Sequence, residues 1–235
     1  MPSITINATD GAGAFHAYVA EPATKPAGAL KGAVVVIQEI FGVNQAMRDI
    51  CAWIADMGFI AICPDLFWRI EPGIDITDKS PEEWQRAFAL LGKFDNAKGI
   101  EDLAATLAAA RAYPGANGKA GTIGYCLGGL LAFQMAEESD ADVNVSYYGV
   151  GLDGLLGGLD KVTKPLLVHI ADLDQYFPAE GRAKVAEAVK GNARIACHNY
   201  NAGHAFARFN GVHWDGLAAT IANGRSAEAL AKALG

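Results

Sequence analysis

Cys126 lies in a stretch whose glycine spacing is typical of an exposed nucleophile. Residues 122–129 read Thr-Ile-Gly-Tyr-Cys-Leu-Gly-Gly, and an apolar run at residues 130–135 follows them. In this elbow pattern the glycines permit a tight turn from a strand into a helix. The sulfur then lies at a helix N-terminus, where free N–H groups and the helix dipole favour a thiolate. Because an ordinary strand-to-helix turn can contain the same glycines, catalysis also requires a base and an acid.

Candidates for the acid and the base come later in the chain, each just after an apolar run. Residues 165–170 precede Asp172 and Asp174, and residues 193–200 precede His204. In a parallel sheet the carboxyl ends of the strands share one edge, so these side chains are expected beside the cysteine. The order nucleophile, acid, histidine is that of α/β-hydrolase triads. Position alone leaves both aspartates open as the acid, and the other would be a turn residue.

The chemistry explains why these residue types are needed together. Little of a free thiol is ionised near neutral pH, so a base has to take its proton. A histidine can accept that proton and later return it to a leaving group, while a carboxylate fixes the tautomer. The backbone N–H groups of Leu127 and Ile40 could stabilise the oxyanion that forms. Glu39 follows an apolar strand, where a carboxylate is more often buried and partnered than solvated, so we predict a functional role for it.

Alternating apolar runs and amphipathic segments predict an α/β fold with a mostly parallel central sheet and helices on both faces. The run Ala-Val-Val-Val-Ile at residues 33–37 is typical of a central strand. Strands are predicted at residues 3–7, 15–20, 33–38, 59–63, 143–147, 165–170 and 193–200 and directly before Cys126. Helices are predicted at residues 44–57, 80–112 with a break at 94–96, directly after Cys126, 180–190 and 214–234, and a loop at 22–32.

Size and composition indicate one globular domain over residues 1–235, because 51% of the residues are hydrophobic and 19% are charged. The net charge of −7 argues against nucleic acid or an anionic membrane as a partner. The first residues, Met-Pro-Ser-Ile-Thr, lack a signal-peptide pattern, and no apolar run approaches the roughly 18 residues of a membrane span. The spacing of the four cysteines is not that of a metal site: Cys51, Cys63, Cys126 and Cys197. This spacing favours a reduced, cytoplasmic protein without a metal.

Several stretches together resemble the dienelactone hydrolase (carboxymethylenebutenolidase) family. They are Gln-Glu-Ile-Phe-Gly-Val-Asn at 38–44, Cys-Pro-Asp-Leu at 63–66, Gly-Tyr-Cys-Leu-Gly-Gly at 124–129, Tyr-Tyr-Gly-Val-Gly-Leu at 147–152 and Gly-His-Ala-Phe-Ala-Arg at 203–208. The resemblance implies an α/β-hydrolase fold with Cys126 as nucleophile, His204 as base and Asp174 as acid. It also implies that Glu39 holds the resting thiol and takes its proton when substrate arrives. Family members hydrolyse lactones or activated esters, among them a dienelactone opened to maleylacetate, without metal or cofactor.

The predicted substrate contacts match the family less closely. By resemblance Arg208 pairs with a substrate carboxylate, and Phe41 also belongs to the pocket. The family's second carboxylate-binding arginine corresponds to Trp84, and Arg86 lies two residues further on. Two residues rotate a helical side chain by about 200°, so Arg86 replaces that arginine only if the helix or its loop has shifted. Two further positions that carry hydroxyl groups in the family are also apolar here, Phe88 and Ala205.

These replacements leave alternatives open. A less polar pocket favours a larger or more apolar ester, so a general thiol esterase or thioesterase is the second hypothesis. A non-catalytic ligand-binding protein would retain the fold but not react at Cys126, and a redox-sensor role lacks a nearby resolving cysteine. A monomer or a small homo-oligomer is expected. The remaining histidines are predicted to be structural or on the surface: His16, His169, His198 and His213.

Overall fold

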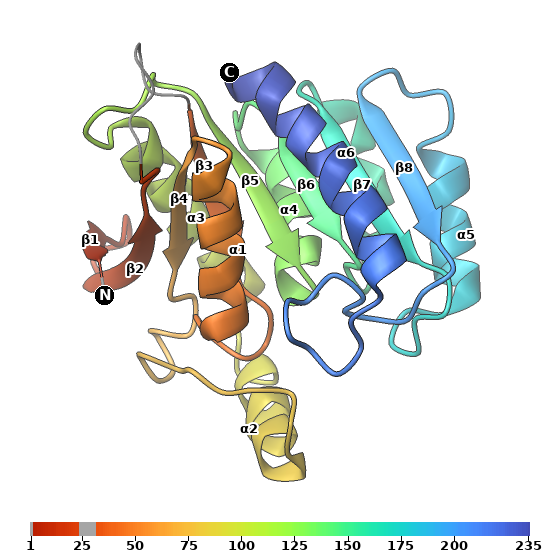
Figure 1. The fold of residues 1–235 in the computed structure, drawn as a ribbon, viewed down its shortest axis with the longest axis horizontal. Coiled ribbons are helices and arrows are strands. Elements are labelled where there is room, and N and C mark those ends of the chain that lie inside the picture. Colours follow the sequence, from red (N-terminus) through yellow and green to blue (C-terminus); the bar gives the residue numbers. More distant parts are fainter. Residues whose placement is uncertain (1, 24–31) are drawn as a thin grey trace. The chain divides into compact units, whose positions relative to one another are not determined.

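The computed structural model describes residues 2–23 and 32–235 (Figure 1). The chain divides into two compact units, Met1–Gly121 and Thr122–Gly235. The boundary falls inside one strand, β5 (Ala120–Tyr125), so no linker separates the units. One domain over residues 1–235 stays a prediction. Residues 24–31 of the predicted loop lie outside the described residues.

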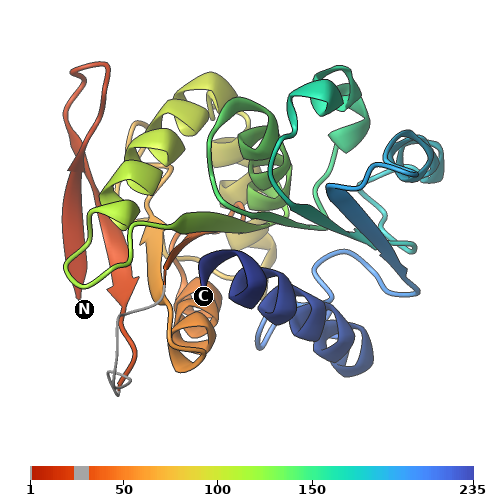
Figure 2. The same cartoon turned by 90° about the horizontal axis from the view of Figure 1, so that it is seen from above.

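The first unit contains four strands in the order β1-β2-β4-β3. β1 pairs with β2 and β2 with β4 in antiparallel fashion, whereas β3 and β4 are parallel. α1 and α3 lie on opposite faces of this sheet (Figure 2). The strands are β1 (Ser3–Asn7), β2 (Ala14–Ala20), β3 (Ala33–Ile37) and β4 (Ile60–Pro64), and the helices are α1 (Gln45–Asp56), α2 (Pro81–Leu91) and α3 (Asn96–Arg111).

The sequence explains where these elements begin and what they bury. All five residues of β3 are buried, as its apolar run predicts. α1 begins after Asn44, whose side chain accepts a hydrogen bond from the Met47 N–H. α2 begins after Ser80, which accepts from the Glu83 N–H, and Pro81 occupies its first turn. The predicted helix starts are therefore confirmed here.

The second unit contains four parallel strands in the order β5-β6-β7-β8. α4 and α5 lie on one face of the sheet and α6 on the other (Figure 2). A buried apolar cluster between β7, α4 and α5 includes Phe133, Val168 and Val185. The further elements are β6 (Asn144–Tyr147), β7 (Leu166–Ala171), β8 (Ile195–Tyr200), α4 (Leu127–Glu138), α5 (Ala179–Ala188) and α6 (Gly216–Leu234), with two short 3₁₀ helices, η1 (Leu152–Gly154) and η2 (Leu156–Lys161).

Polar side chains on the α6 face of this sheet form a continuous series of hydrogen bonds, which we call the α6 hydrogen-bond chain. It joins α6 to three strands and consists of Asn223, Tyr147, Ser226, His169, Tyr200 and Arg225. The successive distances are 3.0 Å, 2.7 Å, 3.0 Å, 2.8 Å and 2.9 Å. Because buried polar groups are stable only when they are bonded, the chain fixes α6 in one position on the sheet. His169 is buried and structural, as predicted.

The predicted elements agree with the structure apart from the two 3₁₀ helices. No structure was predicted for residues 152–161, which contain three glycines and no helical apolar period. α2 ends at Leu91 and α3 begins at Asn96, at the predicted break. Within the described part of the chain, no helix is both long and apolar enough to cross a membrane.

Candidate active site

Cys126 occupies a strained turn between β5 and α4. Its φ and ψ angles are 57° and −114°, an unusual conformation for a non-glycine residue. A Cβ at Gly124 would lie 1.9 Å from the carbonyl oxygen of Gly128, so only glycine fits there. A Cβ at Gly129 would similarly lie 2.2 Å from the carbonyl oxygen of Tyr147. The predicted elbow geometry is confirmed.

The turn leaves the N-terminus of α4 beside the thiol. Leu127 is the first residue of α4, and no side chain caps the helix there. Cys126 is partly exposed, and its own N–H donates to the carbonyl oxygen of Tyr147 at 3.1 Å, which ties the turn to β6. The positive end of the helix dipole would therefore stabilise a negative charge on the sulfur. It would also stabilise the oxyanion formed when the sulfur attacks a carbonyl carbon.

His204 is bonded to Asp174 rather than to Asp172. The His204 Nδ1 lies 2.7 Å from Asp174 Oδ2, and both side chains are buried. The other carboxylate oxygen, Oδ1, accepts from the Tyr176 N–H at 2.8 Å, so the carboxylate is held by its own loop. Asp172 instead accepts from the Asn199 side chain at the surface. The geometry thus distinguishes the two aspartates that spacing alone left open.

The charge of His204 depends on Cys126. Burial lowers the pKa of His204, but the charge of Cys126 raises it, as do hydrogen bonds with Asp174 and Cys126. The net effect is a rise in the pKa from 6.5 to about 10, so the ring is an imidazolium at neutral pH while Cys126 carries its negative charge. With its Nδ1 bonded to Asp174, the imidazole can use Nε2 toward the sulfur.

Two tyrosine rings lie beside the His204 ring, and neither was predicted from the sequence as a site residue. The ring centroid of Tyr148 lies 5.2 Å from that of His204, and the Tyr176 centroid lies 5.0 Å from it. Tyr148 is buried, whereas Tyr176 is 39% exposed. Tyr148 follows β6 directly and lies in the stretch 147–152 that resembles the family, so these two features could have indicated it.

Backbone strain is concentrated at these strand ends. Among the described residues, four non-glycine residues have a positive φ angle, and three of them adjoin the site: Cys126, Tyr148 and Ala205. Such conformations persist only where the surrounding structure holds them, and they occur often at functional sites. Arg208 is only 3% exposed and lies on the same loop as His204, with its N–H donating to the Ala205 carbonyl oxygen at 3.0 Å.

Three predicted site residues follow β3 in the first unit. Glu39, Ile40 and Phe41 are all buried, with exposed fractions of 1%, 4% and 1%. The burial of Glu39 agrees with the prediction that its carboxylate is not solvated. The predicted roles of the three residues in catalysis or binding stay predictions.

Trp84 and Arg86 on α2 have different surroundings. The Trp84 and Phe41 rings form a T-shaped contact with 5.0 Å between their centroids. The Trp84 and Phe88 centroids are 5.5 Å apart. Arg86 is on the surface, where its Nη2 lies 2.5 Å from Glu71 Oε1. Trp84, rather than Arg86, therefore accompanies the predicted pocket residue Phe41. Among the described residues, no cluster of three or more His, Cys, Asp or Glu side chains could hold a metal ion.

Known proteins resemble the chain over almost its whole length. A sequence model of the dienelactone hydrolase family matches residues 15–234. A "Putative carboxymethylenebutenolidase" of Azospirillum brasilense is 51% identical, with 100% of each chain covered. The carboxymethylenebutenolidase of Pseudomonas putida is 40% identical, with 97% of this chain and 95% of that protein covered.

A solved structure agrees with the fold. The crystal structure of a dienelactone hydrolase-like promiscuous phosphotriesterase from metagenomic libraries has a TM-score of 0.78 and is 21% identical. The match covers 100% of this chain and 99% of that one. It confirms the predicted α/β-hydrolase fold.

Proposed function

The chain belongs to the dienelactone hydrolase family and is a hydrolase of carboxylic esters or lactones, and we propose that Cys126 is its nucleophile. The strained turn at the N-terminus of α4 supports this role. The decisive observation is the bond between His204 and Asp174, which leaves the imidazole free to act on the sulfur.

In the first half of the proposed reaction, the Cys126 thiolate attacks the carbonyl carbon and forms a carbon–sulfur bond. The resulting oxyanion would be stabilised by the N–H of Leu127 and that of Ile40. When it collapses, the carbon–oxygen bond to the leaving group breaks and the His204 imidazolium donates its proton to that oxygen. The product of this half is an acyl-enzyme, a thioester on Cys126.

In the second half, the loss of the thiolate charge changes the role of His204. Cys126 is the largest of the influences that raise the pKa of His204, so acylation lowers that pKa. The now neutral imidazole takes a proton from water, and the hydroxide attacks the thioester. The acid product leaves and the thiolate returns. Because His204 holds its proton while Cys126 is charged, we assign the original thiol proton to Glu39, as the resemblance implies.

The substrate we propose is a lactone or activated ester of the dienelactone type, which would give maleylacetate. The buried Arg208, on the loop that carries His204, supports a substrate with a carboxylate. A second candidate is a less acidic ester or thioester. It is favoured by the aromatic cluster of Trp84, Phe41 and Phe88, in which Trp84 takes the position that the resemblance assigns to the family's second arginine.

Replacing the proposed nucleophile tests the mechanism. We expect Cys126→Ala to lower kcat by roughly 10³-fold or more, because no other group can form the thioester. Mass spectrometry after mixing with a slow ester should find one acyl group on Cys126 in the wild type. Cys197→Ala, which removes another partly buried thiol of the same unit, is the control and should retain activity. Near-wild-type turnover by Cys126→Ala would end the assignment.

A panel of dienelactone and neutral p-nitrophenyl esters separates the two substrate classes. If the dienelactone type is right, Arg208→Ala should raise KM for the carboxylate-bearing lactone by about tenfold or more, and raise KM for neutral esters far less. Equal effects on both would remove the recognition role of Arg208. Wild-type activity on neutral esters alone would favour the second candidate.

We further propose that the enzyme works in the cytoplasm on a small-molecule substrate, as a monomer or small homo-oligomer without a nucleic-acid or membrane partner. The net charge of −7 supports the absence of an anionic partner surface. The unpaired state of all four cysteines is compatible with a reducing compartment.

A further inference from the structure

A groove of about 410 Å³ runs along the second unit between α6 and β8, the last strand of the sheet. Small side chains make room for it: Ala196 comes from β8 and Ala229 from α6. Together with Leu167 of β7 they give the groove an apolar floor. One end of the groove reaches Arg194, just before β8, whereas the triad histidine follows the opposite end of that strand. The groove is therefore separate from the triad.

Cationic side chains line both walls of the groove. Arg194, in the turn before β8, and His198, on β8, both line the groove. Arg225 and Lys232 lie two helical turns apart on α6, about 10 Å along its axis. Glu228 is the one carboxylate in the lining, and it is ion-paired with Lys232 at 2.5 Å.

The two arginines have unused donors. Arg194 Nη1 donates to the carbonyl oxygen of Thr163 at 2.6 Å, and Arg225 Nη1 donates to the Tyr200 hydroxyl at 2.9 Å. Both acceptors are neutral, and within residues 32–235 neither arginine lies in an ion pair. A guanidinium carries five N–H donors, so these hydrogen bonds leave several donors of each arginine for a ligand.

We propose that this groove binds an organic anion with an apolar body. The acidic group would bind Arg225 or Arg194, since a guanidinium pairs well with a carboxylate, phosphate or sulfonate. The hydrocarbon would lie over Leu167, Ala196 and Ala229. A bare inorganic anion would use the arginines alone and bind less tightly, and a neutral apolar molecule would use the floor alone.

The pKa of His198 offers a second way to detect an anion in the groove, separate from any signal of the ligand itself. Burial lowers the pKa of His198, and the charge of Arg225 lowers it further. The buried His169 and the Tyr200 hydroxyl also face this region from the neighbouring strand positions. An anion on Arg225 would offset the charge of that arginine, so the pKa of His198 should rise when the groove is filled.

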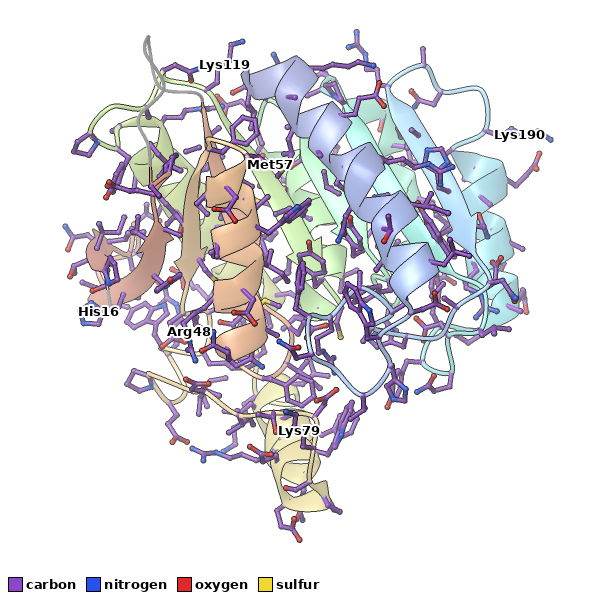
Figure 3. The ribbon with its side chains drawn as sticks, viewed as in Figure 1. His16, Arg48, Met57, Lys79, Lys119 and Lys190 are labelled. Carbon is purple, nitrogen blue, oxygen red and sulfur yellow. The ribbon has the colours of Figure 1, made fainter. Side chains whose placement is uncertain are left out.

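The experiment is a fluorescence titration with anilinonaphthalene sulfonate, an apolar anion, and with N-phenylnaphthylamine, a neutral analogue. We expect saturable binding of the anion, and about tenfold weaker binding or more for Arg225→Gln and for Arg194→Gln. Lys190→Gln is the matched control, since Lys190 (labelled in Figure 3) is a 74% exposed cation of the same unit outside the groove lining. It should bind like the wild type.

Three further measurements decide the matter. Alkylation of Cys126 should leave the affinity unchanged, which separates the groove from the triad. Arg225→Lys, which retains a cation, should recover part of the binding and serves if Arg225→Gln does not fold. NMR titration should find a higher pKa for His198 when the anion is bound. Equal binding of the neutral analogue, or affinities untouched by both glutamine variants, would overturn the proposal.

Discussion

At the scale of single residues, the charge of Cys126 controls the protonation of His204. The pKa of His204 is about 10 although burial opposes the charged form, because a charged Cys126 and Asp174 favour it. In the proposed reaction, the charge of Cys126 appears and disappears during turnover and would thus switch one imidazole between acid and base. That mechanism needs no separate acid and base for its two halves.

This coupling predicts a measurable shift. Alkylation of Cys126 with iodoacetamide should lower the pKa of His204 from about 10, because it removes the largest influence that raises it. NMR titration of the histidine ring protons would record the change. Cys197→Ala should leave the His204 titration where it is in the wild type. An unchanged pKa after alkylation would mean that the imidazolium does not depend on the thiolate.

The exposed tyrosine beside His204 predicts a second effect. Tyr176→Ala should lower kcat/KM roughly five- to tenfold, because the imidazole loses one of the two rings that hold it in place. Tyr176→Phe should retain most of the activity if the ring and not the hydroxyl matters. Leu173→Ala, on the same loop and 61% exposed, is the control. A phenylalanine variant as poor as the alanine variant would contradict the role of the ring.

Candidate reactive residues could be proposed from the sequence because the chemistry of hydrolysis restricts their types. A thiol between glycines, a carboxylate and a histidine after strands leave few alternatives, and the bond between His204 and Asp174 agrees with them. The choice between Asp172 and Asp174 rested on the family resemblance, since both follow β7. Tyr148 and Tyr176 were missed because a tyrosine at a strand end or in a loop has no spacing that indicates a contact.

At the scale of elements, one arrangement of protons gives every donor of the α6 hydrogen-bond chain an acceptor. Arg225 can only donate, so the Tyr200 hydroxyl accepts from it, and in this arrangement the Tyr200 proton is donated to His169 Nδ1. His169 then carries its proton on Nε2 and donates to Ser226. A second proton on His169 would face the Tyr200 oxygen with no acceptor arranged for it. The chain therefore requires a neutral His169.

A pH-dependent stability follows from this arrangement. Burial lowers the pKa of His169 well below 6.5, and His198 and Arg225 lower it further. In the unfolded chain the ring protonates near 6.5, so the stabilisation is complete above that pH and is lost as the pH falls from 6.5 toward the folded-state pKa. Urea unfolding at a series of pH values should record this loss.

Two variants separate the titration of His169 from simple packing. His169→Gln should flatten the dependence of the unfolding free energy on pH below about 6.5, since its side chain does not titrate. Ser226→Ala should cost about 1–3 kcal/mol at neutral pH, because it leaves buried partners unbonded, and should retain the acid-side slope. An equally steep slope in His169→Gln would assign the titration to another group.

Elements with strong local signals were predicted well. The caps at Asn44 and Ser80 and the apolar run of β3 each define an element without help from the rest of the chain. The 3₁₀ helices η1 and η2 could not be predicted, because their turns are set by contacts with α4 and α5 and not by a local period. In the α6 hydrogen-bond chain, Tyr147 bonds to residues that lie 76 and 79 positions away in the sequence. Residue spacing cannot predict contacts over such separations.

At the scale of the whole molecule, the two compact units share the strand β5. If β5 unfolds with one unit, the other unit loses part of the same strand. We therefore expect the chain to unfold in a single cooperative transition. Calorimetry should give equal calorimetric and van't Hoff enthalpies. Two resolved transitions, or a limited proteolysis product that remains folded after cleavage near residue 121, would contradict the prediction of one domain over residues 1–235.

The elbow glycines also limit how this enzyme can be adapted to new substrates. Added side chains at Gly124 and Gly129 would collide with main-chain carbonyl oxygens, which cannot rotate away as a side chain can. A library randomised at both positions should therefore return glycine in every active clone. Directed evolution of a different selectivity would have to begin at residues outside the turn, such as the 39% exposed Tyr176 beside His204.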